Sequence, residues 1–520
     1  MTVSPGALRA RLVSGEELAL LDVREQGVHY RGHPFFASSA PLSRLEIMVE
    51  DLVPRRTAPI VLLDGGEEGL AVRAAAKLRE LGYTDVSLLE GGCAGWKAAG
   101  GELFSGVNVP SKAFGEFVEH HYATPRIAPE ELRQFQSQNE KLLILDSRPF
   151  EEYHRMSIPG GIDAPGAELA YRVHDLAPDP DTLVVVNCAG RTRSIIGCQS
   201  LRNAGIPNPV VALKDGTMGW ELAGFACERG ATRIAPPPTA AGQAAALAAA
   251  DRVAARFSVK PASAEQLKEW QSETRRTLYL LDVRSREEFE QSHVAGSRHA
   301  PGGQLVQATD EYVGVRNARL VLVDPARVRA VMTASWLVQM GWDEVYVLGD
   351  LTGCKLEAGP RAARRVPAWQ TIPVREVDLP RATLIDLSTS LRFRERHIPG
   401  AWWAVRSRLG EARRRIGNVE RVVLTSEDSV LAHLAAPEVA ALWPGAALRV
   451  VAGGNAAWFA AGLAAEPGTQ RATTTLDDVW YKPYDHAADY EKHAREYLAW
   501  EVALVEQIRR DPTIRFRSYA

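Results

Sequence analysis

The sequence predicts an α/β protein of four tandem modules, each a small parallel sheet with helices on both faces, followed by a C-terminal helical tail. Three observations predict this fold. At 520 residues the chain is too long for one hydrophobic core. Short apolar runs that end in polar turns alternate with segments of helical periodicity, as in parallel α/β sheets. Three landmarks also recur at nearly fixed spacing, which indicates an internal repeat.

The first two landmarks are apolar runs of the length expected for buried strands. The first run ends in aspartate and a polar turn, in the four copies Leu20–Arg24, Ile144–Arg148, Leu280–Arg284 and Leu384–Ser388. The second run follows each copy, over Pro59–Leu63, Leu183–Asn187, Leu320–Val323 and Val422–Thr425. The next residue lies 42, 42, 42 and 40 positions beyond the aspartate, and is Asp64, Cys188, Asp324 and Ser426 in turn.

The third landmark is a glycine-rich turn with tryptophan, 32 positions further on in three copies. It ends at Trp96, Trp220 and Trp458, whereas the third repeat has only GDLTGC and no tryptophan there. Between the second and third landmarks the apolar residues recur at three- and four-residue steps. We therefore expect helices over Leu70–Leu81, Ser194–Ala204, Val328–Met340 and Val430–Leu442.

The landmarks and linkers divide the chain. We expect modules 1 to 4 over residues 1–110, 125–230, 260–358 and 372–468, with the helical tail over 469–520. The linkers are His121–Pro129, the Pro- and Ala-rich Arg233–Ala246, and Gly359–Pro373. Module pairing stays open, although similar joins before Glu130 and Glu265 hint at one-with-two and three-with-four.

The tail begins with Trp480, Tyr481 and Tyr484 and continues as a charged helix from about His486 to Arg510. We expect this helix to pack across the last module. A partner-binding arm is the alternative.

Composition limits the classes of function. A net charge of −3 gives no electrostatic case for nucleic acid or membrane partners. No run of about 18 apolar residues predicts a membrane span, and residues 1–20 lack a signal-peptide core. The five cysteines show no CxxC spacing and no disulfide framework, which favours a reducing, cytoplasmic setting. The histidines form no cluster at ligand spacing, so we expect no metal and no organic cofactor.

Only the second repeat has a nucleophile after its second strand. Cys188 lies at the carboxyl edge of the expected sheet, where open α/β folds bind ligands. The free amides of the next helix, together with Arg191 and Arg193, favour the thiolate. Gly190 allows the tight turn that directs successive amides inward. We therefore expect Cys188 to attack the outer sulfur of an anionic donor and to hold it as a persulfide for an acceptor.

These motifs resemble those of the rhodaneses, the sulfurtransferases. The resemblance covers essentially residues 1–468 and rests on LLDVR, on IPGG or VAGS, on the six-residue loop from Cys to Arg, and on GGxxGW. It implies four rhodanese-like modules, of which only module 2 is catalytic. It also implies a Cys188 persulfide and a substrate-binding loop of Ala189, Gly190, Arg191, Thr192, Arg193 and Ser194.

The loop sequence bears on the substrate. Phosphatases of this fold place arginine six positions after the cysteine, where Ser194 stands here, so the shorter loop favours sulfur over phosphate. CAGRTR differs from the CRKGVT of thiosulfate users and from the CGSGVT of 3-mercaptopyruvate users. The donor therefore stays open among thiosulfate, 3-mercaptopyruvate and glutathione persulfide, with two arginines favouring an anion such as thiosulfate or the persulfide.

The other three loops lack the thiol, so we expect modules 1, 3 and 4 to be inactive. Asp64 and Ser426 stand in acidic loops, DGGEEG and SEDSVL. The module 3 loop, Asp324-Pro-Ala-Arg327-Val-Arg329, has arginines at the same offsets as the catalytic loop. We expect an internal Asp–Arg pair there, and a residual anion site is the alternative.

Several other polar residues receive structural interpretations. The recurring Asp-x-Arg pairs occur in inactive modules too, so we expect the aspartate to cap a turn and the arginine to bridge to an acid. The segment Glu151–His154 is expected to be structural, because Glu287–Phe289 mirrors it beside an inactive loop. Rimming the active-site mouth is the alternative. Cys93, Cys198 and Cys354 are expected to be inert, and so is Cys227, for which a resolving thiol is the alternative.

The sequence thus predicts a thiosulfate-sulfurtransferase-like enzyme with a small-molecule sulfur donor and a thiol or other nucleophilic acceptor. The alternative is a sulfur-relay or scaffold protein whose inert modules bind a protein partner. Access separates the two hypotheses. An enzyme needs a pocket around Cys188 that neighbouring modules close, whereas a relay needs the loop exposed on a flat surface.

Overall fold

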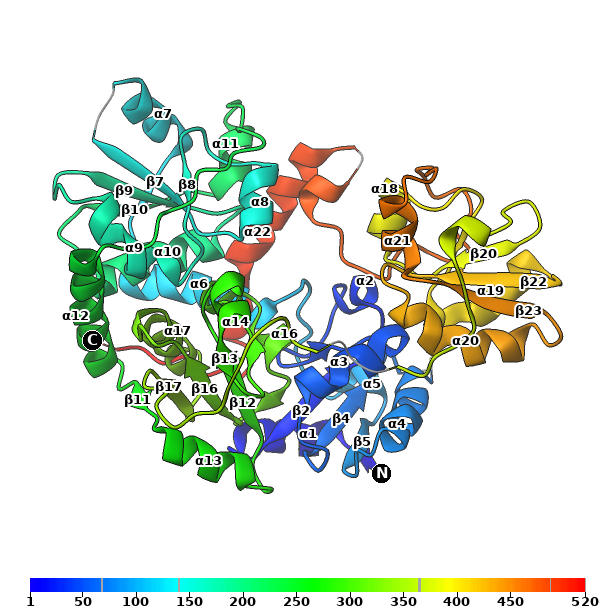
Figure 1. Cartoon of the computed structure of the whole chain (residues 1–520). Coiled ribbons are helices and arrows are strands. Elements are labelled where there is room, and N and C mark those ends of the chain that lie inside the picture. Colours follow the sequence, from blue (N-terminus) through cyan, green and yellow to red (C-terminus); the bar gives the residue numbers. More distant parts are fainter. Residues whose placement is uncertain (67–68, 139–140, 363–365, 487, 520) are drawn as a thin grey trace.

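The structure is a computed structural model that describes residues 1–66, 69–138, 141–362, 366–486 and 488–519. It has four main sheets in chain order, each flanked by helices, as predicted (Figure 1). Two glutamates of the acidic loop of module 1, Glu67 and Glu68, lie outside the described residues. Residues 363–365 of the third linker also lie outside them. No described helix meets the length and hydropathy needed to cross a membrane.

In the first sheet the strands of module 1 have the order β1, β5, β4, β2 and β3, and these strands pair in parallel. Its strands are β1 (Thr2–Val3), β2 (Leu18–Asp22), β3 (Ser38–Ser39), β4 (Ile60–Leu63) and β5 (Val86–Leu89). Its helices are α1 (Pro5–Val13), α2 (Gln26–His29), η1 (Leu42–Arg44), α3 (Leu45–Leu52), α4 (Leu70–Glu80) and α5 (Gly92–Ala98), and α6 (Val109–Tyr122) leads to module 2. The central strands are buried along their length because helices cover both faces.

The second sheet repeats this order as β6, β10, β9, β7 and β8, again parallel. Its strands are β6 (Arg126–Ile127), β7 (Leu142–Asp146), β8 (Ile162–Asp163), β9 (Leu183–Asn187) and β10 (Val210–Leu213). Its helices are α7 (Pro129–Ser137), α8 (Phe150–Arg155), α9 (Glu168–Leu176), α10 (Thr192–Ala204) and α11 (Gly216–Leu222), and α12 (Ala240–Arg256) forms the next linker.

The third sheet has the order β11, β17, β16, β12 and β14. The strands of module 3 are β11 (Lys260–Pro261), β12 (Leu278–Asp282), β13 (His293–Val294), β14 (Arg298–His299), β15 (Val315–Arg316), β16 (Arg319–Val323), β17 (Val345–Leu348) and β18 (Leu356–Glu357). Its helices are α13 (Ala264–Ser272), α14 (Arg286–Gln291), α15 (Gly302–Gln307), α16 (Thr309–Tyr312) and α17 (Val328–Gln339). β13 and β18 form a separate antiparallel pair. Residues 349–354, where the tryptophan turn is lost, form no helix.

The fourth sheet again has the same order, β19, β23, β22, β20 and β21. Its strands are β19 (Thr371–Ile372), β20 (Thr383–Asp386), β21 (Trp402–Trp403), β22 (Arg421–Thr425) and β23 (Ala447–Val451). Its helices are η2 (Val374–Glu376), α18 (Ser390–Glu395), η3 (Arg406–Arg408), α19 (Leu409–Ile416), α20 (Val430–Leu442) and α21 (Gly454–Ala460). Its core clusters contain only residues of this module and the start of the tail, whereas one continuous cluster joins modules 1 to 3.

The similar joins hint at a pairing of module 1 with module 2 and of module 3 with module 4. The structure shows a different arrangement. Module 3 packs on module 2, where Trp336 Nε1 donates to Ser200 Oγ at 2.8 Å. A Cβ on Gly166 would lie 2.4 Å from the Cα of Gly303, so only glycines permit this approach of the two modules. Module 3 also extends the sheet of module 1, because β15 pairs antiparallel with β2. Linker helix α12 packs on both α9 and α17, which holds modules 2 and 3 together.

Module 4 lies beside module 1 (Figure 1), and a buried ion pair joins the two modules. Arg406 of module 4 binds Glu46 of module 1 at 2.8 Å and Glu438 of its own module at 2.5 Å. Beside this pair, Glu25 accepts hydrogen bonds from Ser43 and Ser407, each at 2.8 Å. The carboxyl of Glu25 is 4% exposed, so its ionisation is coupled to the contact between the modules.

We expect Glu25→Gln to remove a pH dependence of stability. Burial raises the pKa of Glu25 from 4.5 to about 7, with Asp478 adding to the rise and Arg408 opposing it. The folded chain therefore keeps a proton that the unfolded chain releases, and stability falls as the pH rises from about 4.5 to 7 by up to about 3 kcal/mol. The variant should unfold at a higher temperature than the parent at pH 8 and near the parent's at pH 5. Parallel pH profiles of the two melting temperatures would contradict this.

The C-terminal tail contacts the last module through its first residues, but its helix packs elsewhere, so the expectation for that helix is wrong. It comprises η4 (Pro483–Asp485) and α22 (Tyr490–Ile508), which starts a few residues later than expected. α22 packs on α6, between modules 1 and 2, because its apolar face of Ala494, Leu498 and Leu504 meets buried residues there (Figure 1). Beyond it, Arg517 N donates to the Gln339 carbonyl of module 3.

The Asp-x-Arg pairs have the predicted structural role. In module 2, Asp146 Oδ1 accepts from the Arg148 amide at 3.1 Å, which caps the turn. The Arg148 guanidinium binds the same carboxylate at 2.8 and 2.7 Å and also donates to the carbonyl of Met156. The pairs Asp22–Arg24 and Asp282–Arg284 repeat this geometry, with carbonyls at the equivalent positions Gly32 and Ser292. The acid that each arginine bridges is therefore its own aspartate.

Candidate active site

Cys188 follows directly on β9 and lies four residues before α10. Strand β9 ends in Asn187, whose side-chain amide donates to Asp146 Oδ2 at 2.9 Å and so ties the ends of β9 and β7 together. The thiol is buried, with 2% of the residue exposed. Its Sγ lies 3.5 Å from Ser194 Oγ, which in turn donates to the Arg191 carbonyl at 2.8 Å. The loop therefore places a thiol at the start of α10, against the positive end of the helix.

The glycine-rich turn before Trp220 is hydrogen-bonded to the Cys188 loop. The amides of Thr217 and Met218 donate to the carbonyls of Cys188 and Ala189 at 2.8 and 3.0 Å. Gly216 has φ +57, and a Cβ there would lie 2.3 Å from the Cys188 carbonyl oxygen. The close approach of these two segments therefore requires glycine.

We expect Gly216→Ala to displace the Cys188 loop and to lower kcat/KM by about 100-fold, as small misplacements of reacting groups do. Gly224→Ala is the matched control, because Gly224 also has positive φ, at +84, but meets nothing within 4 Å. The control should lose only about 1 kcal/mol of stability from backbone strain. Equal kinetic losses in the two variants would show that backbone strain, rather than the contact with Cys188, matters.

A cavity of about 230 Å³ opens on Cys188, and residues from several parts of the chain line it. The loop contributes Cys188, Ala189, Gly190, Arg191 and Arg193 to its lining. Asn108 and Lys112 come from the start of α6, and Gln304 and Gln307 from α15 of module 3. The tail supplies Trp480, Lys482, Tyr484 and Tyr497. Neighbouring modules thus close a pocket around the thiol.

The two arginines of the loop differ in the number of carboxylates that bind them. Arg191 is 5% exposed and binds Glu116 at 2.7 Å, Glu119 at 2.5 Å and Asp215 at 3.2 Å, so three carboxylates surround its guanidinium. Among the described residues, Arg193 binds one carboxylate, that of Glu152, at 2.7 Å. Both arginines line the cavity, but Arg191 is also held by three carboxylates and so fixes the loop to α6.

Neighbouring acidic groups keep the cations of the cavity ionised against the effect of burial. Burial alone would lower the pKa of Arg193, but the Glu152 carboxylate raises it above its usual value. Burial likewise opposes the ammonium of Lys482, whereas Tyr484 and Glu152 raise its pKa overall. Burial, followed by the Glu501 carboxylate, raises the pKa of Tyr497 well above 10, so this phenol stays protonated. The cavity therefore presents cations to an anion beside Cys188.

Glu152 agrees with the alternative of rimming the active-site mouth, whereas Tyr153 and His154 make structural contacts. The segment Glu151–His154 was expected to be structural, yet Glu152 lines the cavity and binds Arg193. Tyr153 donates to the Gly161 carbonyl at 2.9 Å, and His154 Nδ1 lies 3.0 Å from the Ala231 carbonyl, so these two residues are structural.

In modules 1 and 3 the residue at the cysteine position binds the start of its own helix. Asp64 Oδ2 accepts from the Ala71 amide at 3.0 Å. Asp324 Oδ2 accepts from the Arg329 amide at 2.9 Å, and Asp324 Oδ1 from the Arg329 guanidinium at 2.9 Å. The first amides of a helix lack partners within the helix, and here a carboxylate of the chain satisfies them.

Module 4 follows the same principle with a hydroxyl. Ser426 Oγ accepts from the Ala432 amide at 3.3 Å. In module 3 the expected internal pair is present between Asp324 and Arg329, and Arg329 is 1% exposed. The other arginine of this loop, Arg327, binds Asp251 at 2.9 Å.

The remaining cysteines lie away from this chemistry. All five cysteines are free thiols. Burial raises the pKa of both Cys198 and Cys227 to about 12. Cys198 Sγ faces the Val210 carbonyl at 3.6 Å inside the module, and Cys227 packs with the Trp220 cluster rather than lining the cavity. The geometry therefore agrees with inert thiols rather than with a resolving role.

Sequence reasoning missed the residues that the tail and module 3 bring to the cavity. The aromatic group around Trp480 was a signal, but nothing in its spacing relates it to a loop almost 300 residues earlier. Behind the loop, Glu501 accepts from Thr192 Oγ1 at 3.2 Å and binds Lys112 at 3.0 Å, so Thr192 faces the tail rather than the cavity. A comparison of the repeats position by position could have found Gln304, which stands where module 2 has Glu168.

The chain belongs to the rhodanese-like domain family. This family matches residues 4–99, 128–223 and 263–353, which fall in modules 1, 2 and 3. The resemblance of the sequence motifs to the rhodaneses is thereby confirmed.

One solved structure is similar to this chain over its full length and indicates the class of enzyme. The crystal structure of a thiosulfate sulfurtransferase from Pseudomonas aeruginosa is 48% identical, covers 100% of both chains and superposes with a TM-score of 0.95. The protein is a rhodanese-type sulfurtransferase. A curated relative, an HTH-type transcriptional regulator of Mycobacterium tuberculosis, is 36% identical over 91 residues, which is 18% of this chain and 39% of the regulator. The chain thus spans well under half the length of that relative.

Proposed function

We propose that this sulfurtransferase moves sulfane sulfur from an anionic donor, thiosulfate or a low-molecular-weight persulfide, to a thiol or other nucleophilic acceptor through a Cys188 persulfide. The observation that carries the proposal is the enclosed cavity that joins the Cys188 thiol to Arg193 and Lys482. A thiol at a helix start with cations beside it suits attack on a negatively charged sulfur compound. The Pseudomonas relative is a thiosulfate sulfurtransferase, which supports thiosulfate as a donor.

The chemistry takes two displacement steps at sulfur. The Cys188 thiolate attacks the outer sulfur of thiosulfate, a new sulfur–sulfur bond forms, and sulfite leaves with the electron pair of the broken bond. Arg193 and the amides at the start of α10 then hold the negative terminal sulfur of the persulfide. An acceptor thiolate attacks that terminal sulfur, and the electron pair returns to Cys188. A low-molecular-weight persulfide donates in the same way, with its thiolate as the leaving group.

In this proposal the other three modules are structural. Asp64, Asp324 and Ser426 supply no thiol and bind the helix starts themselves. Modules 1 and 3 shape the cavity instead, through Gln26, Gln304 and Gln307. The burial of Cys188 and its enclosure by these parts favour a small-molecule enzyme over a relay that would need an exposed loop.

Steady-state kinetics test the proposal. With thiosulfate and a small thiol as varied substrates, we expect the parallel double-reciprocal lines of a substituted-enzyme mechanism. Glutathione persulfide and 3-mercaptopyruvate should be compared under the same conditions, to rank the donors. Absence of transfer from all three donors would overturn the proposed function.

A further inference from the structure

Modules 2 and 3 contain the same arginine cluster at equivalent positions. Residues of module 3 follow their counterparts in module 2 by 136 positions, so Arg329 corresponds to Arg193 and Glu288 to Glu152. The same offset relates Asp324 to Cys188. Each arginine is also reached by a residue of the other module, and these residues, Glu168 and Gln304, are again 136 positions apart. The paired modules therefore give two versions of one site within the same chain.

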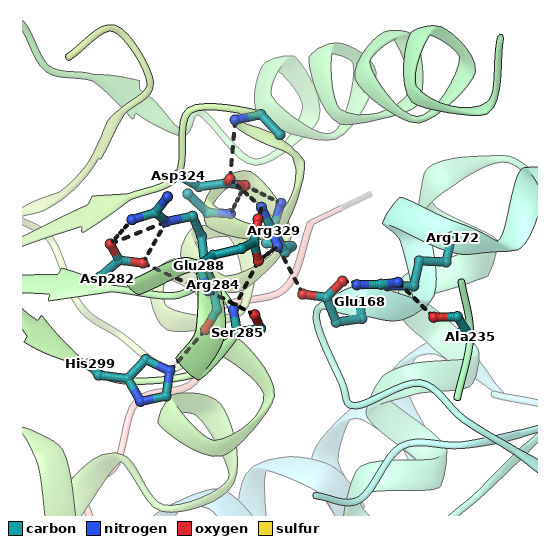
Figure 2. Close-up of polar contacts among 12 residues, drawn as sticks. Glu168, Arg172, Ala235, Asp282, Arg284, Ser285, Glu288, His299, Asp324 and Arg329 are labelled. Atoms are coloured by element: carbon teal, nitrogen blue, oxygen red, sulfur yellow. Dashed lines mark hydrogen bonds and ion pairs between the residues drawn. The ribbon is translucent and has the colours of Figure 1, made fainter. Parts of the chain in front are cut away.

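In module 3 three carboxylates surround the guanidinium of Arg329 (Figure 2). Arg329 Nη1 binds Glu168 of module 2 at 3.0 Å and Glu288 at 2.5 Å, and Nη2 binds Asp324 at 2.9 Å. Figure 2 shows these three carboxylates converging on one guanidinium. The Arg329 side chain is 2% exposed and its charge is balanced by these carboxylates, so it does not offer a binding site to an anionic ligand.

In module 2 two of these three carboxylates are replaced, one by a glutamine side chain and one by a cysteine. Glu152 keeps the paired contact of Glu288, to Nη2 at 2.7 Å and Nη1 at 3.2 Å. Gln304 stands where Glu168 stands and accepts from Nη1 at 3.4 Å without contributing a charge. The Cys188 thiol stands where Asp324 stands. The Arg193 side chain is 14% exposed and lines the cavity.

We propose that Gln304, supplied by the inactive module 3, is a specificity residue that leaves the positive charge of Arg193 available to the anionic donor. It is not a catalytic residue, since it acts by bonding to Arg193 without neutralising it. The inference deepens the proposed function and rests on it, because the anion concerned is the sulfur donor. A glutamate at 304 would recreate in module 2 the saturated cluster of module 3. Glu152 and Glu311 already line the cavity, so a further carboxylate there would oppose an anion.

Alkylation of Cys188 tests this inference without any sulfur transfer. Iodoacetate is an anion and iodoacetamide is neutral, and both alkylate a thiolate with loss of iodide. The ratio of their rates therefore reports the charge around Cys188 independently of the thiolate fraction, and peptide mass spectrometry resolves Cys188 from the other cysteines. We expect Gln304→Glu to lower the iodoacetate-to-iodoacetamide ratio about tenfold, from one added charge near the site.

Two variants distinguish charge from structure. Gln304→Met is neutral and of similar size, so its ratio should stay within about twofold of the parent, because the charge balance around Arg193 is unchanged. Glu168→Gln makes the opposite exchange at the equivalent position and should leave the ratio at Cys188 unchanged. In parallel, Gln304→Glu should raise the KM for thiosulfate about tenfold with little change in kcat.

The outcomes separate this inference from the proposed function. An unchanged ratio in Gln304→Glu, or an equal fall in Gln304→Met, would overturn the role of Gln304 even if sulfur transfer proceeds. If the parent chain shows the expected alkylation pattern but forms no persulfide with any donor, the proposed function fails and the charge at Arg193 serves another anion.

Discussion

Replacing Cys188 by serine should abolish sulfur transfer while the fold stays intact. A serine hydroxyl cannot hold sulfane sulfur, so kcat/KM should fall on the order of 10⁴-fold or more, as expected for loss of a catalytic nucleophile. The exchange is nearly isosteric, and Ser426 in module 4 shows that a hydroxyl is compatible with this loop position. The free energy of unfolding should therefore change by less than about 1 kcal/mol. Steady-state transfer and urea denaturation of the same preparation measure the two effects.

Cys227→Ser is the control for this prediction. Cys227 is partly buried, its pKa is raised to about 12, and it does not line the cavity. Its loss should leave transfer within about twofold of the parent, since replacements away from the chemistry seldom alter the rate by more. Substantial activity in Cys188→Ser, or a comparable loss in Cys227→Ser, would mean that the sulfur carrier has been misassigned.

Methionine at the two equivalent arginines should have opposite consequences. Arg329→Met leaves Asp324, Glu168 and Glu288 without their common cation, two of them well buried, and should destabilise the chain by about 3–5 kcal/mol. Arg193→Met removes the cation beside Cys188 and should lower kcat/KM about 100- to 1000-fold. The one carboxylate that loses a partner, Glu152, is partly exposed and keeps its ion pair with Lys482 at 3.9 Å, so the loss of stability should be smaller.

Urea unfolding and thiosulfate kinetics on both variants decide between these roles. The account requires the larger stability loss in Arg329→Met and the larger kinetic loss, at a temperature where both are folded, in Arg193→Met. A catalytic defect in folded Arg329→Met as large as that in Arg193→Met would show that the two clusters are not divided into structural and substrate-binding versions.

Most of the module architecture could be predicted from the sequence because its determinants are local. Apolar runs such as Leu183–Asn187 and the helical periodicity of Val328–Met340 match β9 and α17 within a residue or two. The position of Cys188 between strand and helix was also predictable, since the Cys-to-Arg loop directly joins two strongly patterned elements. The repeat spacing in turn identified the equivalent residues of the other modules.

The arrangement of the modules and the closure of the site could not be predicted in this way. Contacts such as Gly166 against Gly303 depend on the shapes of two folded surfaces rather than on local pattern. The tail helix has an apolar face that any apolar groove could cover, and the sequence does not distinguish α6 from module 4 as its partner. The ion pair of Arg191 illustrates the same limit. Its partner Glu116 lies on α6, a helix outside the module that contains the loop.

The central claim is that Cys188 carries sulfur as a persulfide inside the enclosed cavity. Intact-mass spectrometry of the full chain after brief exposure to thiosulfate tests it most directly, with Cys188→Ser alongside. The account predicts that the parent chain gains the mass of one sulfur atom, that an acceptor thiol removes this gain, and that the variant never acquires it. A sulfur gain that persists in Cys188→Ser, or no gain in the parent with thiosulfate, 3-mercaptopyruvate or glutathione persulfide, would contradict it.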